Sequence, residues 1–372
     1  MTAMERAEGT FDGSRLRLAR TLVGKTQAEL SRSLDVSHQY IAALENGRKQ
    51  PTDVLLNAIA ELTGFEPWFF VGNQRLEEFR DEECHFRRRQ TTPVAARNQV
   101  LAHGTLFGEL LRYFEEHLEL PETNFPEAEV HDGADVERAA EKCRMTWGLG
   151  LDTPIDSMTR VLESAGAVVV KLEASPKVDA FSRPGDHPVV VLNTCKGSSS
   201  RARFDMAHEC GHLVMHGGME TGDRETEMQA DAFASALLLP RAGFVREFPR
   251  SGYIDWAALL RLKARWKVSL AAIIRRAYDL QLLSAVQYQR AYKQLSARGW
   301  RTGEPGEFEH EDPEIVCEAI STLFPDDATP LAHSLGWTFE LLEQVVGGPL
   351  PACSSPEPAG KVIPITRWRR GR

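Results

Sequence analysis

The side chains best suited to chemistry lie in one stretch, RFDMAHECGHLVMHG (203–217). His208 and His212 are four residues apart, so on a helix they project from one face and can hold one Zn²⁺ through ring nitrogens at about 2.0–2.1 Å. Glu209 follows the first histidine and faces the water that such a metal activates, from which it can take a proton. The spacing H-E-x-x-H therefore predicts a zinc-dependent hydrolytic site.

A third protein ligand is needed to complete a catalytic zinc site, because water or substrate takes the fourth position. A second predicted helix, ETEMQADAFASALLLP (225–240), carries Glu227 and Asp231 four residues apart. We expect Glu227 to bind the zinc and Asp231 to accept the free ring N–H of a ligand histidine, which fixes the tautomer of that ring. Glu225 is the less favoured ligand, because no acid follows it at the same spacing.

His216 is the remaining histidine of the motif. It lies eight residues after His208, about two turns along the axis, which is too far to share the metal. Gly217 and Gly218 predict that the helix ends there. We expect His216 to cap the helix, and the alternative is a contact with the substrate or its oxyanion. Cys210, inside the motif, projects from another face and is expected to pack in the core.

The motif also has a structural interpretation. H-E-x-x-H occurs by chance on ordinary helices, and some domains with such a site bind metal without cutting. The strands predicted before the motif and the acidic helix after it favour metal binding, which is the context that a motif of this kind requires. Whether the bound metal is used to cut stays open at this point.

Composition sets the broad class of the chain. Its 372 residues allow two or three domains, and 42% hydrophobic with 26% charged residues is ordinary for a soluble protein. No apolar run is long enough for a transmembrane helix, and the first residues lack the pattern of a secretion signal. The six cysteines are scattered without a C-x-x-C pair, which favours a reducing, cytoplasmic location. The net charge of −9 argues against non-specific coating of nucleic acid.

Residues 13–70 have the pattern of a small helical bundle. Thr26 and Glu29 have the spacing of a capping box, Ser37 is a second N-cap, and Gly47 and Gly64 are stop signals. FEPWFF (65–70) follows as an aromatic latch on the bundle. Short, sharply capped helices of this kind are typical of a helix-turn-helix.

In such a domain the helix at about 37–46 would lie in the major groove of DNA with its first residues facing base edges. Those residues are Ser37, His38, Gln39 and Tyr40, and Gln39 can read adenine. Gln27 and Arg48 would contact phosphates, with further contacts from other basic residues (Arg15, Arg17, Arg20, Lys25, Lys49).

The charge of this segment weakens the prediction. Residues 1–70 hold eight Lys and Arg against nine Asp and Glu, a net −1, whereas free-standing DNA readers usually carry a basic surface. Two readings stay open: weak half-sites whose affinity comes from a homodimer, or a domain used for protein interaction. Glu45 and Asn46 are expected to brace and cap helices rather than read bases.

The rest of the chain predicts a mainly α fold with an α+β core. We divide it into a helical connector (71–150), a domain with a small sheet (151–250), a helical hairpin resembling a second helix-turn-helix (251–300), and C-terminal helices with a basic tail (301–372). AVVVKLE (167–173) and HPVVVLNT (187–194) are the predicted strands. The basic residues of the hairpin are expected to pack on neighbouring elements rather than bind DNA (Lys263, Arg265, Lys267, Arg275, Arg276).

Taken together, residues 203–217 and 225–240 resemble the ImmA/IrrE family of bacterial metallopeptidases. The likeness runs from about Pro154 to Leu283, including DAFS (179–182) and LKARWKVSLAAIIRRA (262–277); Cys210 departs from it where an apolar residue is usual. The resemblance implies a zincin-like domain with His208, His212 and Glu227 as zinc ligands and Glu209 as general base. Residues 13–70 are similar to the Xre/Cro-like helix-turn-helix, and chains that join both modules form a recognisable subgroup.

Members of that family act on a DNA-binding repressor, cleaving it or causing its removal, to switch on stress or mobile-element genes. We therefore expect a cytoplasmic DNA-binding regulator that cuts a partner repressor, with no membrane association. The substrate would bind extended along an exposed sheet edge at 188–193, and the connector or the tail would gate the site. The alternatives are a non-proteolytic transcription factor whose metallopeptidase-like domain senses a ligand or metal, and a component of a toxin–antitoxin-type pair.

Overall fold

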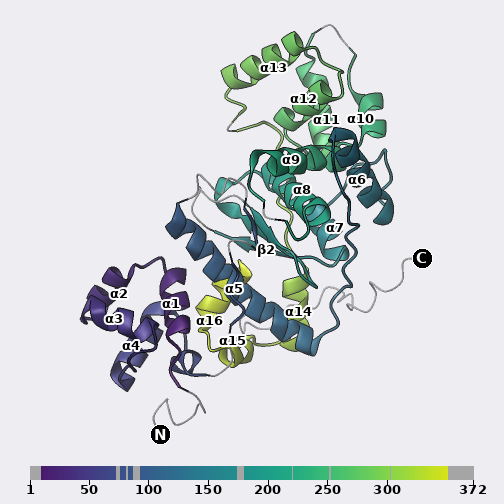
Figure 1. The fold of residues 1–372 in the computed structure, drawn as a ribbon. Helices are drawn as coiled ribbons and strands as arrows, with labels where there is room; N and C mark the ends of the chain where they lie inside the picture. Colours follow the sequence, from purple (N-terminus) through teal and green to yellow (C-terminus); the bar gives the residue numbers. More distant parts are fainter. Residues whose placement is uncertain are drawn as a thin grey trace.

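A computed structural model describes residues 10–72, 76–80, 83–86, 93–173, 180–219, 221–250, 253–301 and 303–350. Figure 1 shows a helical bundle at one end, a long helix that lies between this bundle and a small sheet, and further helices beyond the sheet. This arrangement confirms the mainly α fold with an α+β core. No helix in the described part of the chain is long and apolar enough to span a bilayer. The basic tail lies outside the described residues.

The bundle consists of α1 (Gly13–Leu22), α2 (Gln27–Ser33), α3 (His38–Glu45), α4 (Asp53–Thr63) and the 3₁₀-helix η2 (Pro67–Phe70). The predicted caps are present: Thr26 and Glu29 form a reciprocal capping box, the Ser37 hydroxyl accepts the N–H of Tyr40, and Gly64 ends α4 with a φ of 79°. Local sequence therefore sets the start of each helix in the pair α2–α3.

A buried carboxylate holds this pair against α1. Glu45 is 4% exposed and accepts hydrogen bonds from Arg20 Nε at 2.5 Å and from Gln27 Nε2 at 2.7 Å. The bracing role expected of Glu45 is confirmed. Arg20 thus has its partner inside the domain, and Arg15 likewise donates to the carbonyl of Phe69 at 2.7 Å. The structure therefore gives both of these arginines, which were expected to contact phosphates, partners inside the domain.

The sheet has the strand order β1-β3-β4-β2, from β1 (His85–Phe86), β2 (Val168–Leu172), β3 (Phe181–Arg183) and β4 (Val189–Asn193). β2 and β4 are the two predicted strands and pair in parallel, whereas β3 pairs antiparallel with β4 and with β1. β4 has β2 along its whole length and β3 opposite Val189–Val191. The expectation of an exposed edge at 188–193 was therefore wrong, because this strand lies inside the sheet.

Side chains alternate across the sheet, as the pleat requires, and feed two hydrophobic cores. Val168 and Val170 face one core with the bundle, α5 (Val94–His117), α14 (Ile315–Leu323), α15 (Thr329–Leu335) and α16 (Phe339–Val346). Val169 and Val190 face the other, built with α6 (Gly133–Thr146), α7 (Met158–Ser164), α8 (Ser199–Met215), α9 (Arg224–Leu238), α10 (Arg241–Glu247), α11 (Trp256–Trp266), α12 (Leu270–Asp279) and α13 (Ala285–Ala297). The connector thus contributes α5 to the first core and α6 to the second.

The aromatic latch predicted at 65–70 joins the bundle to the C-terminal helices. Phe65 pairs with Trp337 in an antiparallel bridge, and Thr338 N–H donates to the carbonyl of Gly64 at 3.0 Å. Phe65 and Phe69 stack with ring centroids 4.1 Å apart, and both are 2% exposed. The two ends of the described chain are therefore packed in one core.

An acidic segment, residues 303–314, connects α13 to α14 along the second core. Three of its carboxylates meet the first turns of other helices, where unpaired N–H groups and the helix dipole favour negative charge. Glu304 accepts from Leu270 N of α12 at 2.8 Å, Glu307 from Ser200 N of α8 at 3.1 Å, and Glu311 from Thr159 N of α7 at 2.8 Å.

Buried basic residues of the hairpin have internal partners. Lys263, 1% exposed, contacts Glu304 at 2.8 Å and Glu307 at 2.5 Å. Arg276 donates to the carbonyl of Leu239 at 2.9 Å and to Glu137 at 2.8 and 2.5 Å. The expectation that these charges pack on neighbouring elements is confirmed for both residues.

Candidate metal centre

Two helices, α8 and α9, carry the residues of the predicted centre and pack closely together. Ser198 caps the start of α8, which ends at Met215 with His216 as its C-cap. Gly211 lies where the helices meet: a Cβ there would come within 3.0–3.2 Å of three side-chain atoms of Phe233. The glycine of the motif therefore allows α9 to approach the helix that bears both histidines.

The structure brings the three expected ligands together. One ligand atom from each of His208, His212 and Glu227 lies within 4.8 Å of the others. The two Nε2 atoms are 3.1 Å apart, and the Glu227 carboxylate lies 3.6 Å from His208 Nε2 and 3.4 Å from His212 Nε2. Two imidazole nitrogens and one carboxylate around one point are the donor set of many catalytic zinc sites.

The protonation states of these groups suit a cation. Burial lowers the pKa of His212 to about 4, which leaves the neutral ring that a metal requires. Burial alone would raise the pKa of Glu227, but contacts with His208 and His212 outweigh it and lower the pKa to about 2. Glu227 Oε1 is buried and has no hydrogen-bond partner among the described residues. The residues present therefore fit a divalent metal.

Hydrogen bonds behind the histidines fix their orientation. Asp231 Oδ1 lies 2.8 Å from His208 Nδ1, as the spacing in α9 predicts. His212 Nδ1 lies 2.9 Å from His216 Nδ1, and His216 Nε2 lies 2.8 Å from Gln229 Oε1. If His216 donates to Gln229, its Nδ1 accepts from His212, and His212 Nε2 keeps its lone pair for the centre.

His216 therefore lies outside the group of ligand atoms, as its position in the sequence predicts. It is 1% exposed, and both ring nitrogens have a partner. No ring nitrogen of His216 is left for a substrate oxyanion. The structure favours the orienting role of this residue over the alternative contact.

Glu209 lies beside the centre and is fully buried. Its Oε2 accepts a hydrogen bond from Ser182 Oγ at 2.7 Å, and its Oε1 has no hydrogen-bond partner within the described chain. Burial raises the pKa of Glu209 to about 7. Ser182 belongs to β3, which the sequence did not predict; its only signal was the resemblance at DAFS, of which Asp179 lies outside the described residues.

One residue beside the centre was not predicted from the sequence. His85, on β1, stacks on His212 with ring centroids 5.1 Å apart and an interplanar angle of 15°. Its Nδ1 lies 2.8 Å from Thr221 Oγ1, and burial lowers its pKa to about 3. Nothing in the local pattern marks it, because a two-residue strand has no periodicity to detect.

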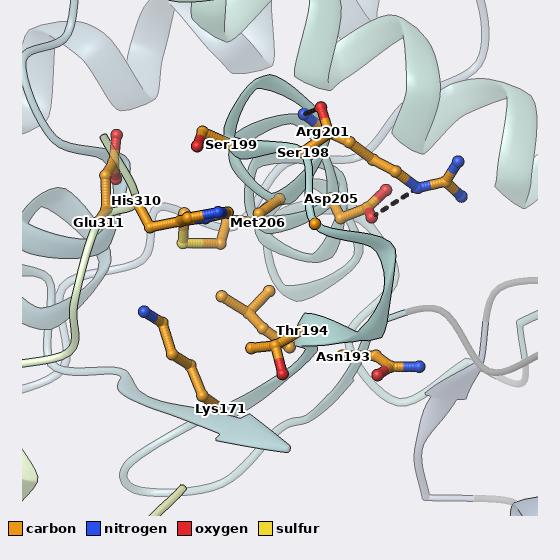
Figure 2. A pocket seen from close by; sticks show the side chains of 13 residues that line it. Lys171, Asn193, Thr194, Ser198, Ser199, Arg201, Asp205, Met206, His310 and Glu311 are labelled. Carbon is orange, nitrogen blue, oxygen red and sulfur yellow. Dashed lines mark hydrogen bonds and ion pairs between the residues drawn. The ribbon is translucent and has the colours of Figure 1, made fainter. Parts of the chain in front are cut away.

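A separate hollow lies at the opposite end of α8, where the acidic segment crosses it. Figure 2 shows Lys171 of β2, His310 of the segment, and the ion pair between Arg201 and Asp205 around this hollow. The Arg201 Nε and Asp205 Oδ2 atoms of this ion pair are 3.5 Å apart. The residues that line the hollow include neither the three expected ligands nor Glu209, so the hollow is distinct from the metal centre.

The expected DNA-reading residues lie at the start of α3. Ser37 is used as the N-cap, whereas His38 and Gln39 are exposed. Tyr40 is half-buried and donates to the carbonyl of Gln50 at 3.1 Å. Gln27 already donates to Glu45, so only its second amide hydrogen is left for a phosphate. Arg48 and Lys49, which follow α3 in the chain, are exposed, and so is Arg17, which contacts Glu45 of α3.

Comparisons with known proteins agree with this division. Residues 162–278 match a peptidase family model described as the IrrE N-terminal-like domain, and residues 16–67 match a model described as helix-turn-helix. No curated protein matches the chain. β1 and the acidic segment lie outside both matched ranges. The chain thus combines, in the order predicted from its sequence, a helix-turn-helix domain of the kind found in DNA-binding regulators and a metallopeptidase-like domain of the IrrE type.

Proposed function

We propose that this protein is a cytoplasmic transcriptional regulator with a zinc-dependent endopeptidase domain. The observation that carries the proposal is the convergence of His208, His212 and Glu227 on one point beside the buried carboxyl group of Glu209. These are the four groups that a zinc peptidase needs for metal binding and proton transfer.

Each group has a distinct task in peptide hydrolysis. Zinc held by the three ligands would polarise the scissile carbonyl and make a water more acidic. Glu209 Oε1, the oxygen without a partner, takes a proton from the attacking water and passes it to the leaving amine, while Ser182 holds Oε2 in place. A pKa of about 7 suits a group that must accept and release a proton near neutral pH.

The helix-turn-helix domain indicates which kinds of partner the protein has. A helix-turn-helix that presents His38 and Gln39 to solvent can bring the peptidase to DNA. We propose that the protein binds an operator as a homodimer and cuts a DNA-binding repressor in a stress or mobile-element response. The acidic balance of residues 1–70 supports a dimer, because one half-site alone would bind weakly.

Burial also supports a second candidate function. His208, Glu209 and His212 are each 0% exposed, and such an enclosed centre suits a domain that senses a metal without cutting. In that case operator binding would respond to zinc and survive the loss of Glu209 as a base. One measurement distinguishes the two functions.

That measurement is cleavage of a proteome-derived peptide library by the zinc-loaded protein, read by mass spectrometry of new termini. A purified helix-turn-helix repressor encoded beside the gene serves as a folded substrate. The wild type should cut at defined bonds, and Glu209→Gln should lose at least ~100-fold in rate, the scale of general-base catalysis, while keeping its zinc. Equal products from both proteins, or none from the wild type, would refute the peptidase function.

A further inference from the structure

We propose that His85 of the connector is a further catalytic residue, whose Nε2–H donates a hydrogen bond to the carbonyl oxygen of the peptide bond that is cut. The proposal rests on the endopeptidase function proposed above. His85 lies outside both matched family ranges. The proposal therefore places a group that contacts the substrate in a part of the chain that neither family model covers.

The first observation is an unsatisfied buried nitrogen. His85 is 3% exposed, and its Nε2 has no hydrogen-bond partner among the described residues. Leaving a buried polar atom unpaired costs free energy, and such atoms in native proteins call for an explanation. A group that waits for a substrate atom is one such explanation, because binding then supplies the missing partner.

The second observation is its place beside the ligands rather than among them. The ring of His85 stacks on His212, yet the group of atoms within 4.8 Å consists of His208, His212 and Glu227 only, for the residues that the structure describes. His85 is therefore not one of the grouped ligands. A hydrogen-bond donor on a ring that stacks on a ligand is suited to stabilise negative charge that develops on a carbonyl oxygen beside the centre.

The third observation is how the ring is held. Thr221 Oγ1 lies 2.8 Å from His85 Nδ1. When this hydroxyl donates to Nδ1, the proton of the neutral ring resides on Nε2, which becomes the donor. Thr221, 7% exposed, is thus the positioning residue that selects the active tautomer.

Strand pairing links His85 to the general base. In the register of β1 and β3, His85 lies opposite Ser182, the residue whose hydroxyl holds Glu209. Directly opposite residues have Cβ atoms about 4.5–5.5 Å apart. One cross-strand pair therefore positions both the proposed donor, His85, and Ser182, which holds the general base Glu209. The connector thus contributes a residue to the site.

The test uses the full-length zinc-loaded protein and a peptide that the wild type cuts. His85→Leu should lower kcat at least ~100-fold, the typical effect of losing one oxyanion donor, with smaller changes in KM and in zinc content. His85→Gln, which keeps an N–H, should recover part of the rate. His131→Leu, at an exposed histidine of the second core's periphery, is the matched control and should behave as the wild type.

A second readout does not depend on activity. Histidine-selective ¹⁵N NMR of the metal-free protein, with the signal absent from His85→Leu as the assignment, should show His85 protonated on Nε2. Thr221→Val should shift the ring toward the other tautomer and lower kcat. A ring protonated on Nδ1 in the wild type would overturn the donor assignment.

The outcomes separate the two proposals. If the wild type cuts nothing, both the endopeptidase function and the role of His85 are wrong. If the wild type cuts and His85→Leu is equally active, only the role of His85 is wrong. Faster cleavage by His85→Leu would also refute it, and would show that β1 blocks the site instead.

Discussion

Asp231 offers the sharpest test of how the metal centre is built. Its carboxylate lies 2.8 Å from His208 Nδ1, so we expect it to keep that nitrogen protonated and to leave the Nε2 lone pair for the metal. Asp231→Asn removes the negative charge and introduces an NH₂ group that can face Nδ1 instead. Zinc affinity should therefore fall although no ligand has been changed.

The magnitude follows from the exposure of this side chain. Loss of the hydrogen-bond partner of a ligand typically costs 10–100-fold in metal affinity. The Asp231 side chain is 49% exposed, so water can partly replace it, and the lower end of that range applies. We expect about a tenfold loss, equivalent to about 1.4 kcal/mol.

The assay is competition with a chromophoric chelator for Zn²⁺ at fixed pH. Glu225→Gln is the matched control, because it removes an exposed acid from the first turn of the same helix, and it should leave the affinity unchanged. Glu227→Gln, which removes a ligand, should lose far more than Asp231→Asn. If Asp231→Asn and Glu225→Gln have the same affinity, the orienting role of Asp231 is refuted.

Two predictions concern the rest of the chain. Burial raises the pKa of Glu163 to about 7, so between about pH 4.5 and pH 7 the folded protein retains a proton that the unfolded chain releases, and this group lowers the free energy of unfolding by about 3 kcal/mol as pH rises. Urea unfolding at pH 5 and pH 8 should therefore show a decline in the wild type that is larger by about this amount than the decline in Glu163→Gln. Equal declines in the two proteins would contradict the prediction. Gln39→Ala should weaken binding to a selected operator by about 1–3 kcal/mol without weakening binding to random DNA. Arg48→Ala should weaken binding to both DNAs and reduce the salt dependence of binding. Fluorescence anisotropy measures each affinity, and an equal loss for Gln39→Ala on both DNAs would rule out base reading.

Helical periodicity explains why the convergence of His208, His212 and Glu227 could be predicted from the sequence. His208 with His212, and Glu227 with Asp231, are each four residues apart, and a helix converts that spacing into a shared face without help from the rest of the fold. The only tertiary assumption was that the two faces meet. Gly211 shows how the sequence satisfies it, since its missing side chain makes room for Phe233.

The remaining site residues could not be found in this way. His85 and Ser182 lie on strands of two and three residues, which are too short to show alternation and exist only through pairing with other strands. The error about residues 188–193 has the same cause, because the pattern of β4 is the same whether or not β3 covers it. In each case the structure depends on pairing with a strand that is distant in the sequence.

Charge was equally ambiguous when taken from sequence alone. Arg15 and Arg20 looked suited to phosphates, but the structure pairs Arg20 with the buried Glu45 and directs Arg15 to the carbonyl of Phe69. Lys263 likewise meets two carboxylates of the acidic segment. A basic residue is informative about nucleic acid only once its internal partners are known.

The sheet is the structural link between the two modules. β2 directs Val168 and Val170 into the core that contains the bundle, and Val169 into the core that contains α8 and α9. Because a shift of one residue would exchange these faces, the same register is required by both modules. β1 extends this sheet from the connector and carries His85 to His212, and α5, which follows β1 in the chain, packs on α1 of the bundle. If the protein acts as proposed, a shift of the bundle on DNA would reach, through α5, the chain segment that carries His85 beside His212, and we expect this packing to couple DNA binding to the proposed peptidase site.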